Sequence, residues 1–76
     1  MALVALVALG SCAARLLLRT EERIGSLRGR FHDFRPRLGD PLPLMPTYHP
    51  AYLLRSPGET AKVGADLRLV AERLGL

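Results

Sequence analysis

The amino end of the chain is the feature that most constrains its fold. An unbroken apolar run, MALVALVAL, leads directly into Gly10 and Ser11. The run is far shorter than the roughly 20 residues that a membrane-spanning helix needs. A short, continuous apolar run that ends at a glycine is typical of a strand buried on both faces in a parallel sheet. We therefore expect a strand from about Ala2 to Leu9 in an α/β fold.

A helix is expected after this strand, from about Ser11 to Arg19. Ser11 is a favourable N-cap, and the following CAARLLL is rich in helix formers whose leucines would face the sheet. Cys12 is the only cysteine, which excludes an internal disulfide, and we expect it to be buried. In an alternative interpretation, the apolar run is a lipoprotein signal and Cys12 is the acylated residue. The strand is preferred, because a secretory signal carries positive charge before its apolar stretch and the first basic residue here is Arg15.

The middle of the chain, TEERIGSLRGRFHDFRPR, is polar and basic. Its glycines and proline interrupt any long helix, so we expect a turn and a short edge strand or hairpin near Leu27 to Phe34. His32 has no second ligand at a suitable spacing and is expected at the surface. The arginines of this segment would suit either phosphate contact or a solvated edge: Arg28, Arg30, Arg35 and Arg37.

The proline-rich stretch that follows allows one more strand, near Leu42 to Met45. Pro41, Pro43 and Pro46 cannot donate to a sheet, so we expect an edge strand or a short one.

A helix from about Pro57 to Leu74 is the clearest element in the chain. Ser56, Pro57 and Glu59 together form a capping-box pattern. The helix carries an apolar stripe, which we expect to pack against a sheet: Val63, Leu67, Val70 and Leu74. Charged pairs one turn apart are expected on its other side: Lys62 with Asp66, and Arg68 with Glu72.

The segment PTYHPAYLLR lies between the last strand and the last helix, and we expect it to be a loop that carries function. His49, held before the rigid Pro50, is a candidate proton or hydrogen-bond donor. A leucine wedge beside Arg55 could enter a DNA groove, but from these residues alone a turn with a satisfied histidine is the preferred interpretation. The net charge of +4 also favours a polyanionic partner. The two tyrosines, Tyr48 and Tyr52, are expected to pack the loop, with stacking on DNA as the alternative.

PTYHPAYLLR, with the Pro-bearing turn and the Asp-Leu-Arg helix after it, resembles the second conserved motif of family 4 (thermophile-type, iron–sulfur) uracil-DNA glycosylases. The strand ending in Ala-Leu-Gly, the Ala-rich helix and the later Leu-Arg-Gly-Arg resemble the order of that family's C-terminal half. The resemblance runs from about Leu3 to Leu74. It implies that residues 1–76 are the C-terminal part of a single domain, a partial three-layer αβα sandwich of the uracil-DNA glycosylase type that lacks its N-terminal half.

The family resemblance also implies a chemistry, namely flipping of uracil out of the DNA stack and hydrolysis of its glycosidic bond. His49 would be the catalytic histidine, donating a hydrogen bond to the uracil O2 as negative charge develops there, an effect worth about 3 kcal/mol. Leu53 matches the leucine that enters the minor groove, with Leu54 as its neighbour, and Arg55 would meet a phosphate. The implied partner is uracil-containing DNA, with no membrane, and the implied location is the cytoplasm, associated with the nucleoid.

The chain also departs from the family's pattern. It has no Gly-Glu-Ala-Pro-Gly loop to position water, no Asn or Gln to read the uracil edge, and no aromatic matching the one that stacks on the base. The full-length family carries a four-iron, four-sulfur cluster, but a lone Cys12 cannot bind one, so no cofactor is expected in this chain. We therefore expect a truncated, inactive fragment whose N-terminal half is a missing partner. The alternatives are a small basic DNA-binding module without catalysis and a small lipoprotein anchored through Cys12.

Overall fold

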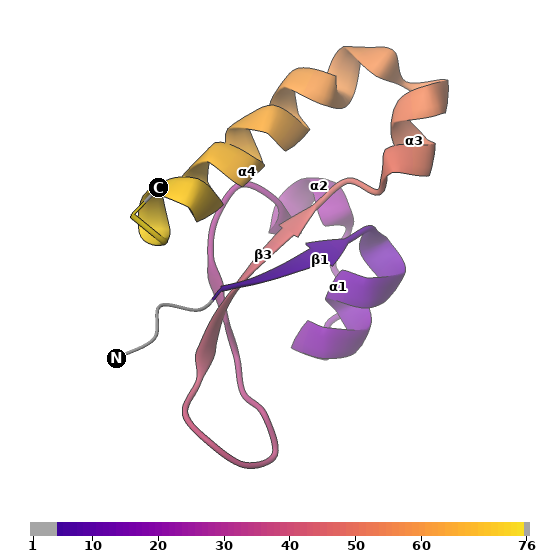
Figure 1. Cartoon of the computed structure of the whole chain (residues 1–76). Helices are drawn as coiled ribbons and strands as arrows, with labels where there is room; N and C mark the ends of the chain where they lie inside the picture. Colours follow the sequence, from indigo (N-terminus) through magenta and orange to yellow (C-terminus); the bar gives the residue numbers. More distant parts are fainter. Residues whose placement is uncertain (1–4, 76) are drawn as a thin grey trace.

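The computed structural model describes residues 5–75 as a small mixed α/β domain with one sheet (Figure 1). The strands within this range are β1 (Leu6–Leu9), β2 (His32–Phe34) and β3 (Leu42–Thr47). The helices are α1 (Ser11–Leu18), α2 (Ile24–Leu27), α3 (Pro50–Arg55) and α4 (Thr60–Arg73), and a 3-10 turn, η1 (Pro57–Glu59), precedes α4. The first part of the expected amino-terminal strand, residues 2–4, lies outside the described residues.

Strand β3 is the centre of the sheet, whose order is β1-β3-β2. It runs parallel to β1, with Leu6 opposite Leu44, and antiparallel to β2, with His32 opposite the same leucine. The expected strand near Leu42 to Met45 is confirmed. Of its two expected forms, an edge strand or a short one, the edge strand is wrong, because β3 lies between the other two strands. The short edge strand expected within residues 27–34 is β2.

The positions of the two prolines within β3 explain how a proline-rich segment can be a central strand. Along a strand, the backbone groups of alternate residues point toward opposite neighbours. The carbonyl of Thr47 accepts a hydrogen bond from the Gly10 N–H at 2.8 Å, so Thr47 and Pro43 point toward β1, whereas Pro46 points toward β2. Among residues 5–75, the pairing with β1 begins only after Pro43, and the pairing with β2 ends at Leu44, before Pro46 is reached. Within this described part of the chain, each missing N–H therefore faces no paired residue.

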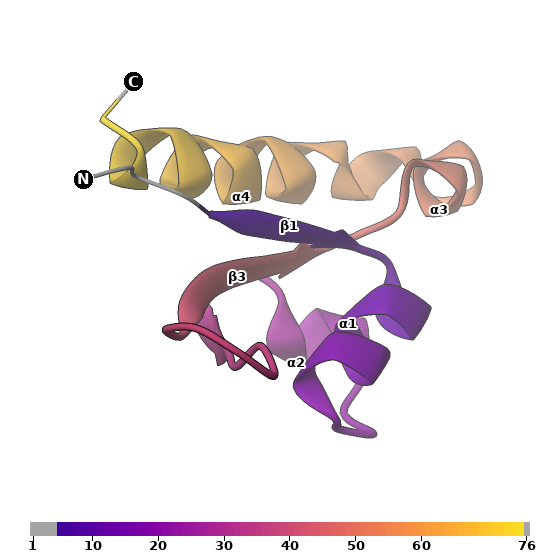
Figure 2. The same cartoon turned by 60° about the horizontal axis from the view of Figure 1, so that its bottom comes forward.

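Helices cover both faces of the sheet, α4 on one side and α1 with α2 on the other (Figure 2). The core on the α1 and α2 side consists of Ala8, Ala14, Leu27 and Leu44. Within α1, Ala14 is buried and Leu18 packs against the core, because they are one turn apart, whereas Leu16 points away and is 79% exposed. The prediction that the α1 leucines face the sheet is therefore wrong for Leu16 and also for Leu17, which is exposed.

Helix α4 covers the other face, where Met45 and Thr47 of β3 are fully buried. The residues of α4 that it buries are Asp66 and Val70. The expected apolar stripe packs only in part, because Leu67 is 46% exposed and the centre of the packed face is an aspartate. The helix is thus rotated relative to the expectation, and an acidic residue expected on its outer side lies against the sheet.

The helix starts also differ from expectation. Gly10, not Ser11, is the N-cap of α1, and it provides no side-chain cap. The capping box before α4 does not form, since neither Ser56 nor Glu59 caps a helix through its side chain. Instead, the Glu59 carboxylate forms an ion pair with Lys62 Nζ at 2.7 Å. Ion pairs of Lys62 with Asp66 and of Arg68 with Glu72 had been expected. Neither pair forms among the described residues.

Three further features of the α1–β2 region were not expected. Helix α2 lies in a segment predicted as a turn, and its Leu27 is buried. His32 is half-buried rather than on the surface, and its Nε2–H donates to the Leu27 carbonyl at 2.9 Å. Cys12, expected to be buried, is exposed in the first turn of α1. Over residues 5–75, no helix combines the length and the apolar character needed to cross a bilayer.

Candidate functional site

The segment predicted as a functional loop is mostly regular structure. Its first two residues, Pro46 and Thr47, end β3, and Pro50 to Arg55 form α3. Only Tyr48 and His49 connect the two. Pro50 occupies the first turn of the helix, where its fixed φ fits and its missing N–H is not needed. The local sequence therefore starts a helix immediately after His49.

His49 is the N-cap of α3, and its imidazole is the capping group. Nδ1 accepts a hydrogen bond from the Ala51 N–H at 3.0 Å. A neutral imidazole has one donor and one acceptor nitrogen, so an accepting Nδ1 places the proton on Nε2. Because the residue is exposed, this Nε2–H can donate to a ligand. The cap thus fixes both the tautomer and the orientation of the ring.

A hollow of about 270 Å³ lies beside His49, where β1 and β3 both end. The carboxyl ends of neighbouring parallel strands meet at one edge of a sheet, which is a favoured place for ligand sites in α/β folds. The residues lining the hollow come from the strand ends, α1, α2 and α3: Gly10, Ser11, Ile24, Tyr48, His49, Ala51, Tyr52 and Arg55.

Gly10 is required by this geometry. Its φ is +92°, a backbone conformation that other residues rarely adopt, and a Cβ at this position would lie 3.1 Å from the His49 Cβ. The close approach lets the end of β1 pack directly against the imidazole.

Two stacked tyrosines pack α3 against the end of β3. The rings of Tyr48 and Tyr52 stack with centroids 4.8 Å apart and an interplanar angle of 24°. Tyr48 is buried and Tyr52 is half-buried. The expectation that these residues pack the segment is confirmed, and the stack holds the first turn of α3 on the strand that precedes it.

The other three candidate residues, Leu53, Leu54 and Arg55, lie on the last turn of α3. Arg55 is exposed and lines the same hollow as His49, so the structure brings these two residues together. Leu53 is half-buried, whereas Leu54 is 85% exposed, and neither lines the hollow. Leu54, rather than Leu53, is the leucine most available to a partner.

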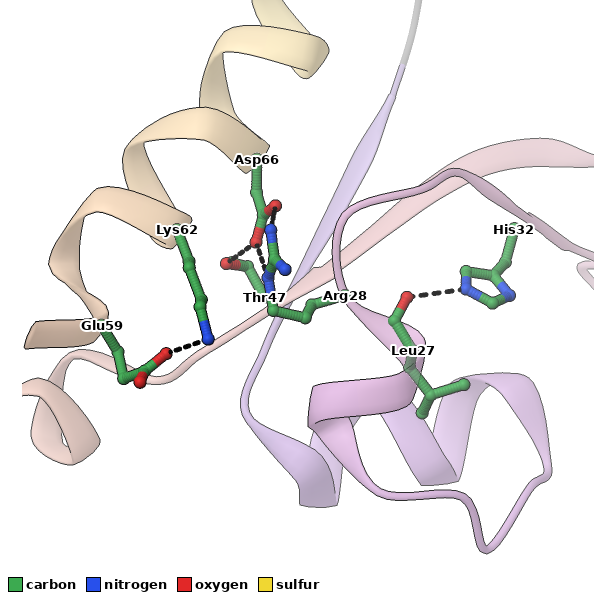
Figure 3. Close-up of polar contacts among 7 residues, drawn as sticks. All are labelled: Leu27, Arg28, His32, Thr47, Glu59, Lys62 and Asp66. Carbon is green, nitrogen blue, oxygen red and sulfur yellow. Dashed lines mark hydrogen bonds and ion pairs between the residues drawn. The ribbon is translucent and has the colours of Figure 1, made fainter. Parts of the chain in front are cut away.

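A buried polar cluster close to the site was missed by the sequence analysis (Figure 3). The carboxylate of Asp66 is fully buried and accepts from Thr47 Oγ1 at 2.5 Å. It also accepts hydrogen bonds from both Nε (3.0 Å) and Nη2 of Arg28, so the guanidinium and the carboxylate form a bidentate ion pair. The side-chain hydrogen bond with Asp66 raises the pKa of Arg28 above its ordinary value. One sequence signal was present, because Asp66 follows Val63 by three residues and precedes Val70 by four.

Within residues 5–75, no three His, Cys, Asp or Glu side chains are grouped closely enough to hold a metal ion. An iron–sulfur cluster of the kind implied by the family resemblance takes about four cysteine ligands, and this chain has Cys12 alone. The residues present do not fit that cluster.

A search against known protein families, characterised proteins and solved structures finds no match to this chain.

Proposed function

We propose that this chain is the DNA-facing part of a uracil-DNA glycosylase, in which His49 stabilises the departing base. The observation that carries the proposal is the hydrogen bond from the Ala51 N–H to His49 Nδ1. It leaves Nε2–H as a donor with a fixed direction, which is what an oxygen gaining negative charge requires.

His49 acts through its hydrogen bond and needs no proton transfer. As the glycosidic bond of the flipped uracil breaks, charge accumulates on the uracil O2, and a preorganised donor there lowers the barrier by about 3 kcal/mol. The remaining groups must come from elsewhere, because the chain has no Asn or Gln to read the uracil edge. In the proposal, an N-terminal half supplies this amide and the water-positioning loop, and it completes an αβα sandwich around the present sheet.

DNA contact is assigned to the last turn of α3. The exposure of Leu54 favours this residue over Leu53 as the wedge that fills the space left by the flipped base. Arg55 is exposed one residue later, in a position to meet a phosphate. A net charge of +4 supports association with DNA, and with it a place beside the nucleoid.

The proposal is tested by base release from a labelled uracil-containing duplex. The 76-residue chain is assayed beside a version extended at its amino end by the upstream reading frame, each with His49→Ala and His49→Asn variants. Asparagine is a good N-cap, so His49→Asn preserves α3 while it removes the imidazole. We expect base release only from the extended chain, and a loss of about a hundredfold or more in both variants. If the extended chain releases no base, or if His49→Asn retains full activity, the assignment is wrong.

The same assay separates the alternatives. A DNA-binding module without catalysis would bind duplex in a salt-sensitive way but release no base from either version. A lipoprotein anchored through Cys12 would lose the residues before that cysteine, and with them β1, which pairs along β3. That alternative therefore requires a fold other than the one described above.

A further inference from the structure

The buried carboxylate of Asp66 lies at the junction of three segments that are far apart in the sequence. It sits on α4, and its two partners are Arg28, just after α2, and Thr47, the last residue of β3 (Figure 3). Arg28 is 38 residues away along the chain. Burying a carboxylate is costly unless it is paired and hydrogen-bonded, so these contacts hold the three segments in one arrangement.

Thr47 connects this cluster to the candidate site. Its side chain donates to Asp66, while its backbone carbonyl accepts from the Gly10 N–H at 2.8 Å. The residue is therefore held from two sides, by α4 and by the end of β1. Only Tyr48 separates it from His49, and Tyr48 is itself buried.

The contacts that hold Thr47 also determine the position of the His49 side chain. Gly10, which is bonded to the Thr47 carbonyl, also lies against the imidazole, with its ideal Cβ position 3.1 Å from the His49 Cβ. A small shift of the end of β3 would therefore change both the packing of the ring and its hydrogen bond to Ala51. Helix α3 has no fully buried residue of its own, so its position depends on the end of β3 and on the stack of Tyr52 against Tyr48.

We infer that Asp66 and Thr47 are positioning residues, which fix the tautomer and direction of His49 through the end of β3. The inference rests on the proposed function in treating His49 as the working histidine. The alternative is that the cluster only stabilises the packing of α4 on the sheet. The two differ in one measurable respect, since a purely structural role leaves the state of the imidazole unchanged in the molecules that remain folded.

The test measures the His49 tautomer by ¹⁵N chemical shifts of the two ring nitrogens in the 76-residue chain, at a pH where the ring is neutral. Thr47→Val removes the hydroxyl at nearly constant shape, and Thr47→Ser restores it. Asp66→Asn weakens the acceptor. Val70→Ala is the matched control, because it removes buried packing one turn further along α4, at a residue outside the Asp66 cluster.

We expect the Nε2–H form to dominate in the unaltered chain and in Thr47→Ser. In Thr47→Val and Asp66→Asn its excess over the other tautomer falls by about fivefold, as expected for loss of one hydrogen bond. Val70→Ala keeps the unaltered ratio. An unchanged ratio in Thr47→Val, or an equal change in Val70→Ala, overturns the inference. If Asp66→Asn does not fold, the serine and valine variants at position 47 decide alone.

This readout does not depend on base release. Suppose that Thr47→Val changes the His49 tautomer ratio but the extended chain has no glycosylase activity. This outcome would support the positioning role and reject the proposed function. Activity that depends on His49, with a tautomer indifferent to Thr47, would support the proposed function and reject the positioning role.

Discussion

Two neighbouring regions of this small domain are built in opposite ways. Beneath α4, a fully buried carboxylate is satisfied by Thr47 and Arg28, and the strand it holds is buried from Leu44 to its last residue, Thr47. Immediately afterwards, α3 has no buried residue and relies on the His49 cap and the tyrosine stack. A segment that presents side chains to a partner cannot also bury them. Under the proposed function, the first region is the support, and the second is the segment that presents side chains to DNA.

The largest effect in this comparison is expected from Asp66→Ala. The change leaves the Thr47 hydroxyl buried without a partner and the Arg28 side chain, only 20% exposed, without its counter-charge. We expect a loss of about 3 kcal/mol in the free energy of unfolding, measured by urea denaturation. Leu54→Ala is the matched control, because removal of a side chain that is already 85% exposed should change stability by less than about 0.5 kcal/mol. Equal losses of unfolding free energy in the two variants would mean that the Asp66 cluster and α3 do not differ in their contribution to stability.

Gly10→Ala tests the contact between the two regions. The new methyl group would meet His49, and alanine would be forced into a backbone conformation that strongly favours glycine. Strain of this kind costs about 2 kcal/mol, and urea denaturation should show a loss of that order. Gly64→Ala is the control, because Gly64 lies within α4 with open space around its Cβ position, and there alanine should stabilise the helix. A neutral result at Gly10 would mean that neither the positive φ nor the contact with His49 opposes a side chain there, and that the end of β1 does not hold the imidazole.

The elements that could be predicted from sequence are those with local signals. The apolar run predicted β1, and the apolar periodicity after Ser56 predicted α4, since both patterns depend on neighbouring residues. The central place of β3 could not be predicted. Pro43 lacks an N–H on the side of β1 and Pro46 on the side of β2, and within residues 5–75 neither position is paired on that side. Where two distant strands pair with a third has no local sequence signal. The burial of Asp66 likewise depends on a partner far away in the sequence.

The candidate site shows the same division. His49, Arg55 and the two leucines were identified from one contiguous segment, and the structure places His49 and Arg55 around one hollow. The helical state of Pro50 to Arg55 was missed, although Pro50 is a helix-start signal, because the segment was interpreted as a loop. The exposure of Leu54 in place of Leu53 follows from the helix rotation and had no local signal. Which candidate faces outward is thus a tertiary property.

His49→Ala probes the presented segment alone, and its structural effect should be smaller and confined to α3. Loss of the cap removes about 1 kcal/mol of helix stability, so amide exchange in α3 should accelerate by about fivefold while the sheet amides keep their protection. His49→Asn, which can still accept from the Ala51 N–H, should leave exchange in α3 close to normal. Faster exchange throughout the sheet in His49→Ala would show that the cap also supports β3, and that the two regions are not separable.

The smallest effect is expected from Arg55→Ala in the salt dependence of DNA binding. A phosphate contact releases counterions, so its loss should lower the slope of log affinity against log salt by about 1 and weaken binding equally for all sequences. Arg37→Ala is the control of equal charge, because Arg37 is exposed and precedes β3, at the opposite end of that strand from His49. If α3 is the DNA-facing segment, only the Arg55 change should alter the slope, measured by fluorescence anisotropy over a salt series. Equal changes for both arginines would mean that net charge alone governs association, and that α3 does not contact the DNA.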